Sequence, residues 1–470
     1  MPRPVRHATG GSSQRGIFKP QHQSECPPTE DKPRLWLLNP LQAPSGLWNG
    51  NLTYTDFELD QNIGVAKSFY LQMTVNFSDP THLPSCPPTW YAINRTEVYL
   101  GSDLIETTYA DSQYHESLAF LSEQDAHNVA DIHNVNESDL SPRNLYVPTT
   151  AQCSAGHIGY ENARSGTVGN VQASANPQAI TQTSSGYYYI NLDNTCLKAM
   201  RPYVKGFNAK FKIRVYWATT WLAQYAINVN GVQPAPSATP PVVGTLATFF
   251  VSNPSIGSLQ LFVEEETTDS ASLVALEQAH RAGIVDYTTV VRERLQDNPP
   301  AFVGGQQNTT YLRAFRNKSC AILPYLTVPN APADRLTQRL AFASYQLLDA
   351  RGNKLTEILS NDILTSKVFP DQINSSFPNS ANADIRTIVM LPFSKHVQPV
   401  LDKGCSNGSF QLTTLEQLVL VPDGTSATVA GTVNANGETT SCGVNMLTVI
   451  SYSYAHITCM AGQHSVRFES

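Results

Sequence analysis

Alternation of apolar and polar residues marks the clearest strand of the chain, over residues 207–217. A two-residue period places alternate side chains on opposite faces of a strand. The pattern therefore predicts a half-buried strand with one apolar face, and that face consists of Phe207, Ala209, Phe211, Ile213, Val215 and Trp217.

A short helix is predicted just before this strand, over residues 193–204. Asp193, Asn194 and Thr195 are favourable N-cap residues, and Gly206 provides a stop signal at the other end. The apolar positions near helical spacing are Leu197, Met200 and Val204. A strand run begins at Gly186, so residues 186–217 are predicted to form a strand, a helix and a second strand.

Further elements follow from the same rules. Residues 51–60 and 68–77 alternate as strands do, and two apolar runs flank the turn at residues 101–103. Helices are predicted at residues 115–130 and at residues 269–283, where Asp269 or Ser270 is the cap and Gly283 the stop. Residues 134–185 have no sustained period, which predicts a surface loop.

Two patterns occur twice along the chain. Residues 386–421 repeat the order of strand, short helix, glycine and strand, and "EVYLGSDLIETTY" at 97–109 resembles "YQLLDARGNKLTEIL" at 345–359. The repeats keep their order, which favours two related halves at about 35–268 and 284–470. The alternative is that two unrelated all-β domains share such general patterns.

Composition supports an all-β protein. Only 15% of the 470 residues are charged, while Pro, Gly, Asn, Ser and Thr are plentiful, as in short strands joined by many turns. The net charge of −7 argues against a general nucleic-acid-binding surface.

The sequence indicates synthesis in the cytosol. It contains no apolar run long enough to span a membrane and no apolar signal-peptide stretch near residue 1. The eight cysteines form no C-x-x-C pair, so buried free thiols are favoured over zinc or redox sites. Several N-x-S/T sequons occur, for example at Asn51, Asn94, Asn308 and Asn317, and most of them are attributed to chance.

The sequence predicts no catalytic, cofactor-binding or metal-binding residues, and hence no enzyme. None of the common nucleotide, hydrolase or metalloprotease motifs is present. His127 and His133 lie near two aspartates, but their spacing favours a solvated helix face over a metal site. Residues 264–266 are three successive glutamates, which favours a strand end over a carboxylate pair in one cleft.

The N-terminal residues 1–34 form a basic segment without an apolar period. Arg3, Arg6, Arg15 and Lys19 all precede the first acidic residue, Glu25. One interpretation is a flexible tail with incidental charge. The other is an interior arm that contacts packaged DNA, an inner layer or a neighbouring subunit.

The chain resembles a known family, the double jelly-roll major capsid proteins of double-stranded DNA viruses, particularly the virophage and polinton-like kind. The resemblance lies in "INLDNTCLKAMRPYVKGF", "VMLPFSKHVQPVLDKG" and "TEVYLGSDLIETTYADSQYHESLAFLSEQ". It covers most of residues 35–470, apart from 134–185. It implies an all-β fold with a few short helices and two consecutive jelly rolls, at 35–268 and 284–470, joined by a connector helix at 269–283.

The resemblance implies a structural role in the virion capsid. The chain would form homotrimers, pseudo-hexagonal capsomers that tile an icosahedral shell and contact neighbouring capsomers, minor capsid proteins and penton proteins. The loops at 134–185 and 424–443 would project outward. The alternative is a carbohydrate-binding or glycoside-hydrolysing β-sandwich, which is disfavoured because the five tryptophans are dispersed along the chain.

Overall fold

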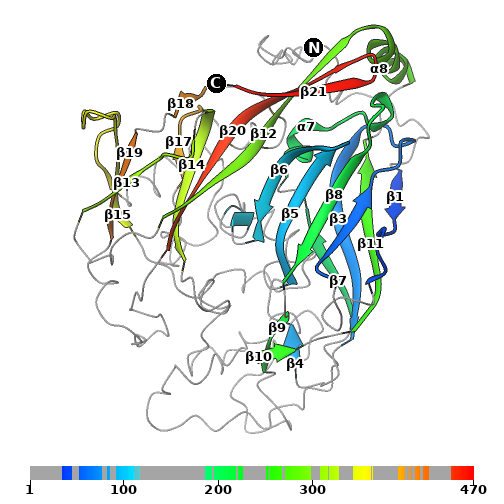
Figure 1. The fold of residues 1–470 in the computed structure, drawn as a ribbon, viewed down its shortest axis with the longest axis horizontal. Coiled ribbons are helices and arrows are strands. Elements are labelled where there is room, and N and C mark those ends of the chain that lie inside the picture. The colour runs from blue at the N-terminus through cyan, green and yellow to red at the C-terminus, as the bar shows by residue number, and fades with distance from the viewer. Residues whose placement is uncertain are drawn as a thin grey trace, which may run out of the picture.

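The structure is a computed structural model built mainly from antiparallel strands (Figure 1). It describes residues 34–44, 52–76, 82–84, 92–110, 112–113, 116, 186–192, 195–218, 221–225, 250–252, 255–266, 270–297, 307–315, 317–327, 342–360, 363, 390–395, 397, 401, 404, 408–412, 416–422 and 446–469. Among these residues, no helix is long and apolar enough to cross a membrane.

The first half of the chain forms two four-stranded sheets, in the orders β1-β11-β3-β7 and β2-β8-β5-β6. Their strands are β1 (Leu35–Leu38), β2 (Tyr54–Glu58), β3 (Ala66–Asn76), β5 (Ile93–Leu100), β6 (Asp103–Tyr109), β7 (Gly186–Asn191), β8 (Phe211–Trp217) and β11 (Ser255–Glu265). A small sheet, β10-β9-β4, contains β4 (His82–Pro84), β9 (Trp221–Tyr225) and β10 (Phe250–Ser252).

The second half forms a six-stranded sheet and a four-stranded sheet. In the larger sheet the order is β12-β20-β14-β17, with β18 on β14 and β21 on β20; in the smaller it is β13-β19-β15-β16. The strands are β12 (Ile284–Asp297), β13 (Asn308–Tyr311), β14 (Lys318–Thr327), β15 (Phe342–Leu348), β16 (Leu359–Ser360), β17 (Leu391–Pro392), β18 (Phe410–Gln411), β19 (Gln417–Pro422), β20 (Met446–Met460) and β21 (Gln463–Phe468).

The two halves have the same strand order. With β4, β9, β10, β18 and β21 set aside, each half has eight strands. In each, the first, eighth, third and sixth strands form one sheet, and the second, seventh, fourth and fifth form the other. Eight antiparallel strands in two facing sheets with crossing connections are a jelly roll. The fold is therefore a double jelly roll, as the sequence predicts.

The strand predicted over residues 207–217 is confirmed from Phe211 onward, where β8 begins; residues 207–210 lie outside it. Phe211, Ile213, Val215 and Trp217 of β8 are buried, whereas the residues between them are half-buried. In β3, Phe69, Leu71 and Met73 are buried in the same way. These side chains fill the space between the two sheets of the first jelly roll, which stabilises the packing of one sheet on the other.

The helix predicted at 193–204 is shorter in the structure. It consists of α7 (Cys196–Met200) and a separate 3₁₀ turn, η3 (Val204–Gly206). Arg201 ends α7 in the left-handed conformation, with φ of 46°, and Pro202 follows it. A left-handed residue followed by proline cannot continue a helix. In the second half, Val397 and Leu401 are helical and lie between β17 and β18.

The helix predicted at 269–283 is present as α8 (Ser270–Ala282). The backbone N–H of Gly283 donates to the carbonyl of Ala279, which completes its last turn. Most of the helix predicted at 115–130, the loops at 134–185 and 424–443, and residues 1–33 of the basic arm lie outside the described residues.

The hydrophobic core continues from one jelly roll into the other. One cluster contains Phe57, Phe69 and Phe211 of the first half together with Tyr287 and Tyr452 of the second. A separate cluster around Phe315 and Tyr345 lies within the second half. The long strands β12 and β20 belong to the second sandwich, and β12 contacts β6 and α7 of the first (Figure 1). The two jelly rolls are thus packed together through a shared apolar layer.

Candidate functional site at the junction of the jelly rolls

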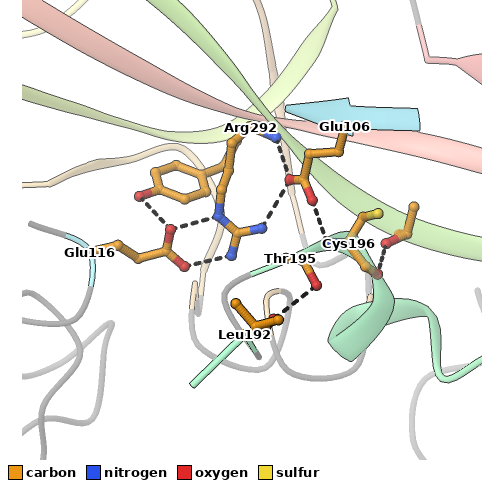
Figure 2. Close-up of polar contacts among 8 residues, drawn as sticks. Glu106, Glu116, Leu192, Thr195, Cys196 and Arg292 are labelled. Carbon is orange, nitrogen blue, oxygen red and sulfur yellow. Dashed lines mark hydrogen bonds and ion pairs between the residues drawn. The ribbon is translucent and has the colours of Figure 1, made fainter. Parts of the chain in front are cut away.

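A buried cluster of charged residues lies where β6 of the first jelly roll meets β12 of the second (Figure 2). Glu106 lies on β6, Arg292 on β12, and Glu116 beyond the end of β6. The exposed fractions of their side chains are 0%, 5% and 4%, respectively. Charged side chains are rarely buried to this extent unless they are paired.

The Arg292 guanidinium binds both carboxylates. Its Nη1 donates to Glu106 Oε1 at 3.1 Å, and its Nε donates to Glu116 Oε2 at 2.6 Å, while Nη2 donates to the other oxygen of Glu116. The backbone N–H of Arg292 also donates to Glu106 Oε1, at 3.0 Å. Because the guanidinium fork matches the two oxygens of a carboxylate, such bidentate contacts fix the relative orientation of the side chains as well as pairing their charges.

Glu106 also serves as the cap of α7. Its second oxygen accepts the backbone N–H of Cys196, the first residue of that helix. The predicted cap residue Thr195 does occupy the N-cap position, but its hydroxyl instead donates to the Leu192 carbonyl at 3.1 Å. One carboxylate therefore joins β6, α7 and β12, and it satisfies a helix N–H that would otherwise be buried without a partner.

The electrostatics of the cluster favour a permanently charged guanidinium. Burial alone lowers the pKa of Arg292, but attraction to Glu116 and Glu106 outweighs it and raises the pKa well above its ordinary value. Burial, followed by the charge of Glu106, raises the pKa of the Cys196 thiol. Burial and the charge of Glu116 likewise raise the pKa of Tyr452, whose hydroxyl lies 3.4 Å from Glu116 Oε2. The Cys196 thiol and the Tyr452 hydroxyl therefore both keep their protons at neutral pH.

The connector α8 is fixed at the same junction by His280. The Nδ1 of His280 donates to the Leu276 carbonyl at 2.8 Å, and its Nε2 accepts from the Tyr287 hydroxyl at 2.9 Å. The ring packs against Tyr203 and Phe207 of the first half. Burial lowers the pKa of His280. This histidine is therefore a neutral packing residue that ties the helix to both jelly rolls.

A hairpin turn provides a further contact between the halves. Ala461 and Gly462 connect β20 to β21, and the carbonyl of Gly462 accepts the backbone N–H of Asn208 at 2.8 Å. His464, two residues later, lies 3.1 Å from the Asp103 carboxylate at the turn between β5 and β6. The junction therefore extends from the buried charges to the surface of the molecule.

The chemistry of this junction is suited to holding two domains together. Its ionisable groups are committed to one another, and no group of three or more His, Cys, Asp or Glu residues among the described positions could hold a metal ion. Cys196, Cys320 and Cys459 are buried free thiols. Burial raises the pKa of each of the three, which disfavours a nucleophilic thiolate.

The residues singled out from the sequence lie elsewhere. Arg3, Arg6, Arg15 and Lys19, like His127 and His133, are outside the described residues. The three glutamates do lie at the end of β11 and just beyond it, as predicted, and they bind three different partners. Glu264 pairs with Lys67, Glu265 accepts from Trp36, and Glu266 pairs with Arg201.

Sequence reasoning missed the Glu106–Arg292–Glu116 cluster. The signal that could have revealed it is a charged residue within a strand. Glu106 lies in the apolar run after the turn at 101–103, and Arg292 lies in the middle of a fourteen-residue strand. The two tryptophans whose side chains the structure describes give no support to the carbohydrate alternative. Trp217 is buried in the core, with its Nε1 donating to Thr55, and Trp36 is bound to Glu265.

Comparison with solved structures finds the same fold over nearly the whole chain. VP54 of PBCV-1, in its crystal structure fitted into a cryo-EM reconstruction of the virophage Sputnik, has a TM-score of 0.56 at 10% identity and covers 96% of this chain and 100% of its own. The PBCV-1 virus capsid model has a TM-score of 0.53 at 10% identity and covers 94% of this chain and 98% of its own. The 3.5 Å cryo-EM structure of the Sputnik virophage has a TM-score of 0.52 at 10% identity and covers 95% of this chain and 91% of its own.

These solved structures are double jelly-roll major capsid proteins of double-stranded DNA viruses. No protein-family model and no curated protein sequence matches the chain. At 10% identity the likeness concerns the fold. That fold is the one that the sequence resemblance implies, with both jelly rolls aligned.

Proposed function

We propose that the chain is the major capsid protein of a double-stranded DNA virus, and that it forms the icosahedral shell of the virion. The observation that carries the proposal is the tandem repeat of one eight-strand order, which aligns with PBCV-1 VP54 over 96% of this chain. The buried charges at the junction support it, because they hold two sandwiches in one fixed arrangement and leave no reactive group in the cluster uncommitted. Rigid blocks of this kind are suited to tiling a surface.

The domain boundaries that follow are also a proposal. Residues 35–268 form the first jelly roll, 269–283 the connector helix and 284–470 the second jelly roll. The loops at 134–185 and 424–443 project from the outer face of the shell. An epitope tag inserted into either loop would then be bound by antibody on assembled particles, and a tag that is hidden on particles would reverse the assignment of the outer face.

The proposed assembly unit is a homotrimer. Two jelly rolls per chain and three chains per capsomer give six lobes, which suit a hexagonal lattice. The capsomers contact one another and the minor capsid and penton proteins. Arg3, Arg6, Arg15 and Lys19 form an interior arm that contacts packaged DNA, an inner layer or a neighbouring subunit.

Light scattering on the purified full chain tests the trimer. We expect a mass three times that of the 51.5 kDa chain. A stable monomer at high concentration, in each of several assembly buffers, would contradict the proposal. Binding of glycans without any self-association would point to the carbohydrate alternative.

A further inference from the structure

The last strand of the chain lies at an open edge of its sheet. Among the described strands β21 pairs with β20 alone, and a two-residue turn, Ala461 and Gly462, joins the two. Figure 1 shows β21 along the top of the molecule, with its first residues near α8. Proteins normally shorten, bend or cover such edges, because a row of open N–H and C=O groups can pair with another strand. This edge is therefore suited to docking an extended segment.

The register of the hairpin decides which backbone groups of β21 face the open edge. Met460 and Gln463 flank the two-residue turn and form a hydrogen-bonded pair, and such pairs alternate along antiparallel strands. The residues that turn their N–H and C=O groups outward are therefore His464, Val466 and Phe468. Among the described residues, no backbone hydrogen bond outside the hairpin involves these three.

The side chains of the three outward-bonding residues share one face of β21. Val466 packs partly against the shared core, and Phe468 is 44% exposed. His464 lies 3.1 Å from the carboxylate of Asp103, whose side chain is 57% exposed. A strand added beside β21 would thus meet a carboxylate at one end, an apolar side chain in the middle and an open aromatic ring at the other end.

One stretch of the basic arm has the sequence that this edge requires. Residues 14–19 read "QRGIFK", which is as long as β21 and contains no proline. In a strand, Arg15, Ile17 and Lys19 would share one face. The stretch therefore combines a central apolar residue with a cation on each side of it.

The pattern of this stretch is complementary to the open edge. When Ile17 lies opposite Val466 in an antiparallel pair, Lys19 lies opposite His464 and beside the Asp103 carboxylate. The residue opposite Phe468 is then Arg15, which can stack on the aromatic ring. Apolar and opposite-charge pairs across neighbouring strands stabilise a sheet.

The length and composition of the intervening chain favour docking on another copy. Lys19 precedes Arg34 by fifteen residues, and an extended chain of that length spans about 50 Å. The prolines between them are Pro20, Pro27, Pro28 and Pro33. Proline-rich linkers act as extended spacers, which would carry the stretch away from its own sheet.

We infer that residues 14–19 of one copy add as an antiparallel strand to the open edge of β21 in a neighbouring copy of the shell. The inference rests on the proposed function, because it takes a second copy as the source of the strand. Backbone hydrogen bonds to β21 supply the affinity, and the alternating side chains of the stretch set its register. The basic arm is then a link between copies that forms on assembly.

The test uses two edge variants and two matched controls of the full chain. Ile17→Asp places a charge opposite Val466, and Val466→Pro removes the outward N–H without removing a bond to β20. The controls are Val5→Asp, which makes the same kind of change elsewhere in the arm, and Val466→Thr, which keeps the N–H. Hydrogen exchange of residues 464–468 is measured in the unassembled chain and in particles, and thermal melting shows that each variant is folded.

We expect exchange of residues 464–468 to slow about tenfold or more on assembly of the wild type and the controls. The two edge variants should give fewer particles, and any particles that form should show no such slowing. Loss of all particles in the edge variants alone, with every variant folded, would also support the inference.

Three results would overturn the inference while the proposed function stands. They are wild-type particles in which residues 464–468 exchange as fast as in the unassembled chain, Ile17→Asp particles in which these residues are as protected as in the wild type, and equal loss of particles in Val5→Asp and Ile17→Asp. Protection already present in the unassembled wild type would place the stretch on its own chain and would also contradict the inference. A wild-type chain that forms no particles under any condition would overturn both.

Discussion

At the scale of single residues, Arg292 holds the junction together. Removing the charge from one side of a buried ion cluster leaves the opposite charges without a partner, and this typically costs about 3–5 kcal/mol. We therefore expect Arg292→Met to lower the free energy of unfolding by about that amount. Urea denaturation of the two proteins measures the difference.

Arg281→Met is the matched control for Arg292→Met. Arg281 pairs with Glu277 on the surface of α8, where its side chain is 75% exposed. Exposed pairs contribute about 0.5 kcal/mol or less, so this variant should unfold almost like the wild type. Equal losses in the two variants would show that burial of Arg292 has no special energetic role.

The lowered pKa of His280 predicts how the free energy of unfolding depends on pH. Burial lowers its pKa in the folded state, so below its ordinary pKa of 6.5 the unfolded chain binds a proton that the folded chain does not. This contribution to stability is present above the unfolded pKa and is lost as the pH falls through the folded pKa. His280→Gln removes that titration.

The measurement is the free energy of unfolding at about pH 7.5 and about pH 5.5. We expect the loss on acidification to be smaller in His280→Gln than in the wild type, whatever the variant's stability at neutral pH. His456→Gln is the control, since His456 is about a third exposed beside Glu469. The same acid loss in His280→Gln and wild type would contradict the assignment.

The residues of the junction could not be read from the sequence, although those of the core could. Ile105 and Glu106 are both buried in succession, because the pairing of β5 with β6 shifts register between Val98 and Tyr99. A strict two-residue period would place them on opposite faces. β8 has no such bulge within its pairing to β2, and its alternation predicted its buried face correctly.

At the scale of elements, the repeated hairpins and strand-helix-strand units predicted two related halves, and the family resemblance predicted that each half is a jelly roll. What they could not predict was length. β16 and β17 have two residues each, and α7 has five. β17 ends at Pro392, which lacks an N–H for the ladder, and α7 ends at Arg201, which is left-handed. Strands this short have too few positions to show a period.

Gly404 allows the helical segment of the second jelly roll to approach α7 and β12. It has φ of 59°, and a Cβ at this position would lie 2.3 Å from the Thr288 carbonyl oxygen and 3.2 Å from that of Ala199. Gly404→Ala should therefore lower the free energy of unfolding by about 2–5 kcal/mol, combining left-handed strain with a steric clash.

Gly352→Ala separates these two costs. Gly352 has φ of 81°, but nothing lies within 4 Å of a Cβ placed there. We expect a loss of about 1–2 kcal/mol from backbone strain alone. Urea denaturation of both variants compares the losses, and a Gly404 variant as stable as the Gly352 variant would argue against the close approach.

At the scale of the whole molecule, the basic arm is predicted to act in assembly and not in folding. The core clusters of the described residues begin at Trp36, beyond the arm. Deletion of residues 1–33 should leave the melting temperature and the trimer unchanged but lower the yield of particles. Differential scanning fluorimetry, light scattering and particle counts measure the three quantities.

A second arm variant tests the role of charge. Replacing Arg3, Arg6, Arg15 and Lys19 by glutamine keeps the length of the arm and removes its positive charge. If charge is what matters, this variant should assemble as poorly as the deletion. Loss of the folded trimer in either variant would place the arm in a core, and an unchanged particle yield and DNA content would remove its assembly role.

Electron microscopy of the purified full chain under assembly conditions tests the central claim most directly. The account predicts capsomers with six lobes, two from each of three chains, that join into closed shells, with the jelly rolls in the arrangement set by the Arg292 cluster. Isolated two-lobed monomers under every assembly condition, or oligomers without the six-lobed outline, would contradict it.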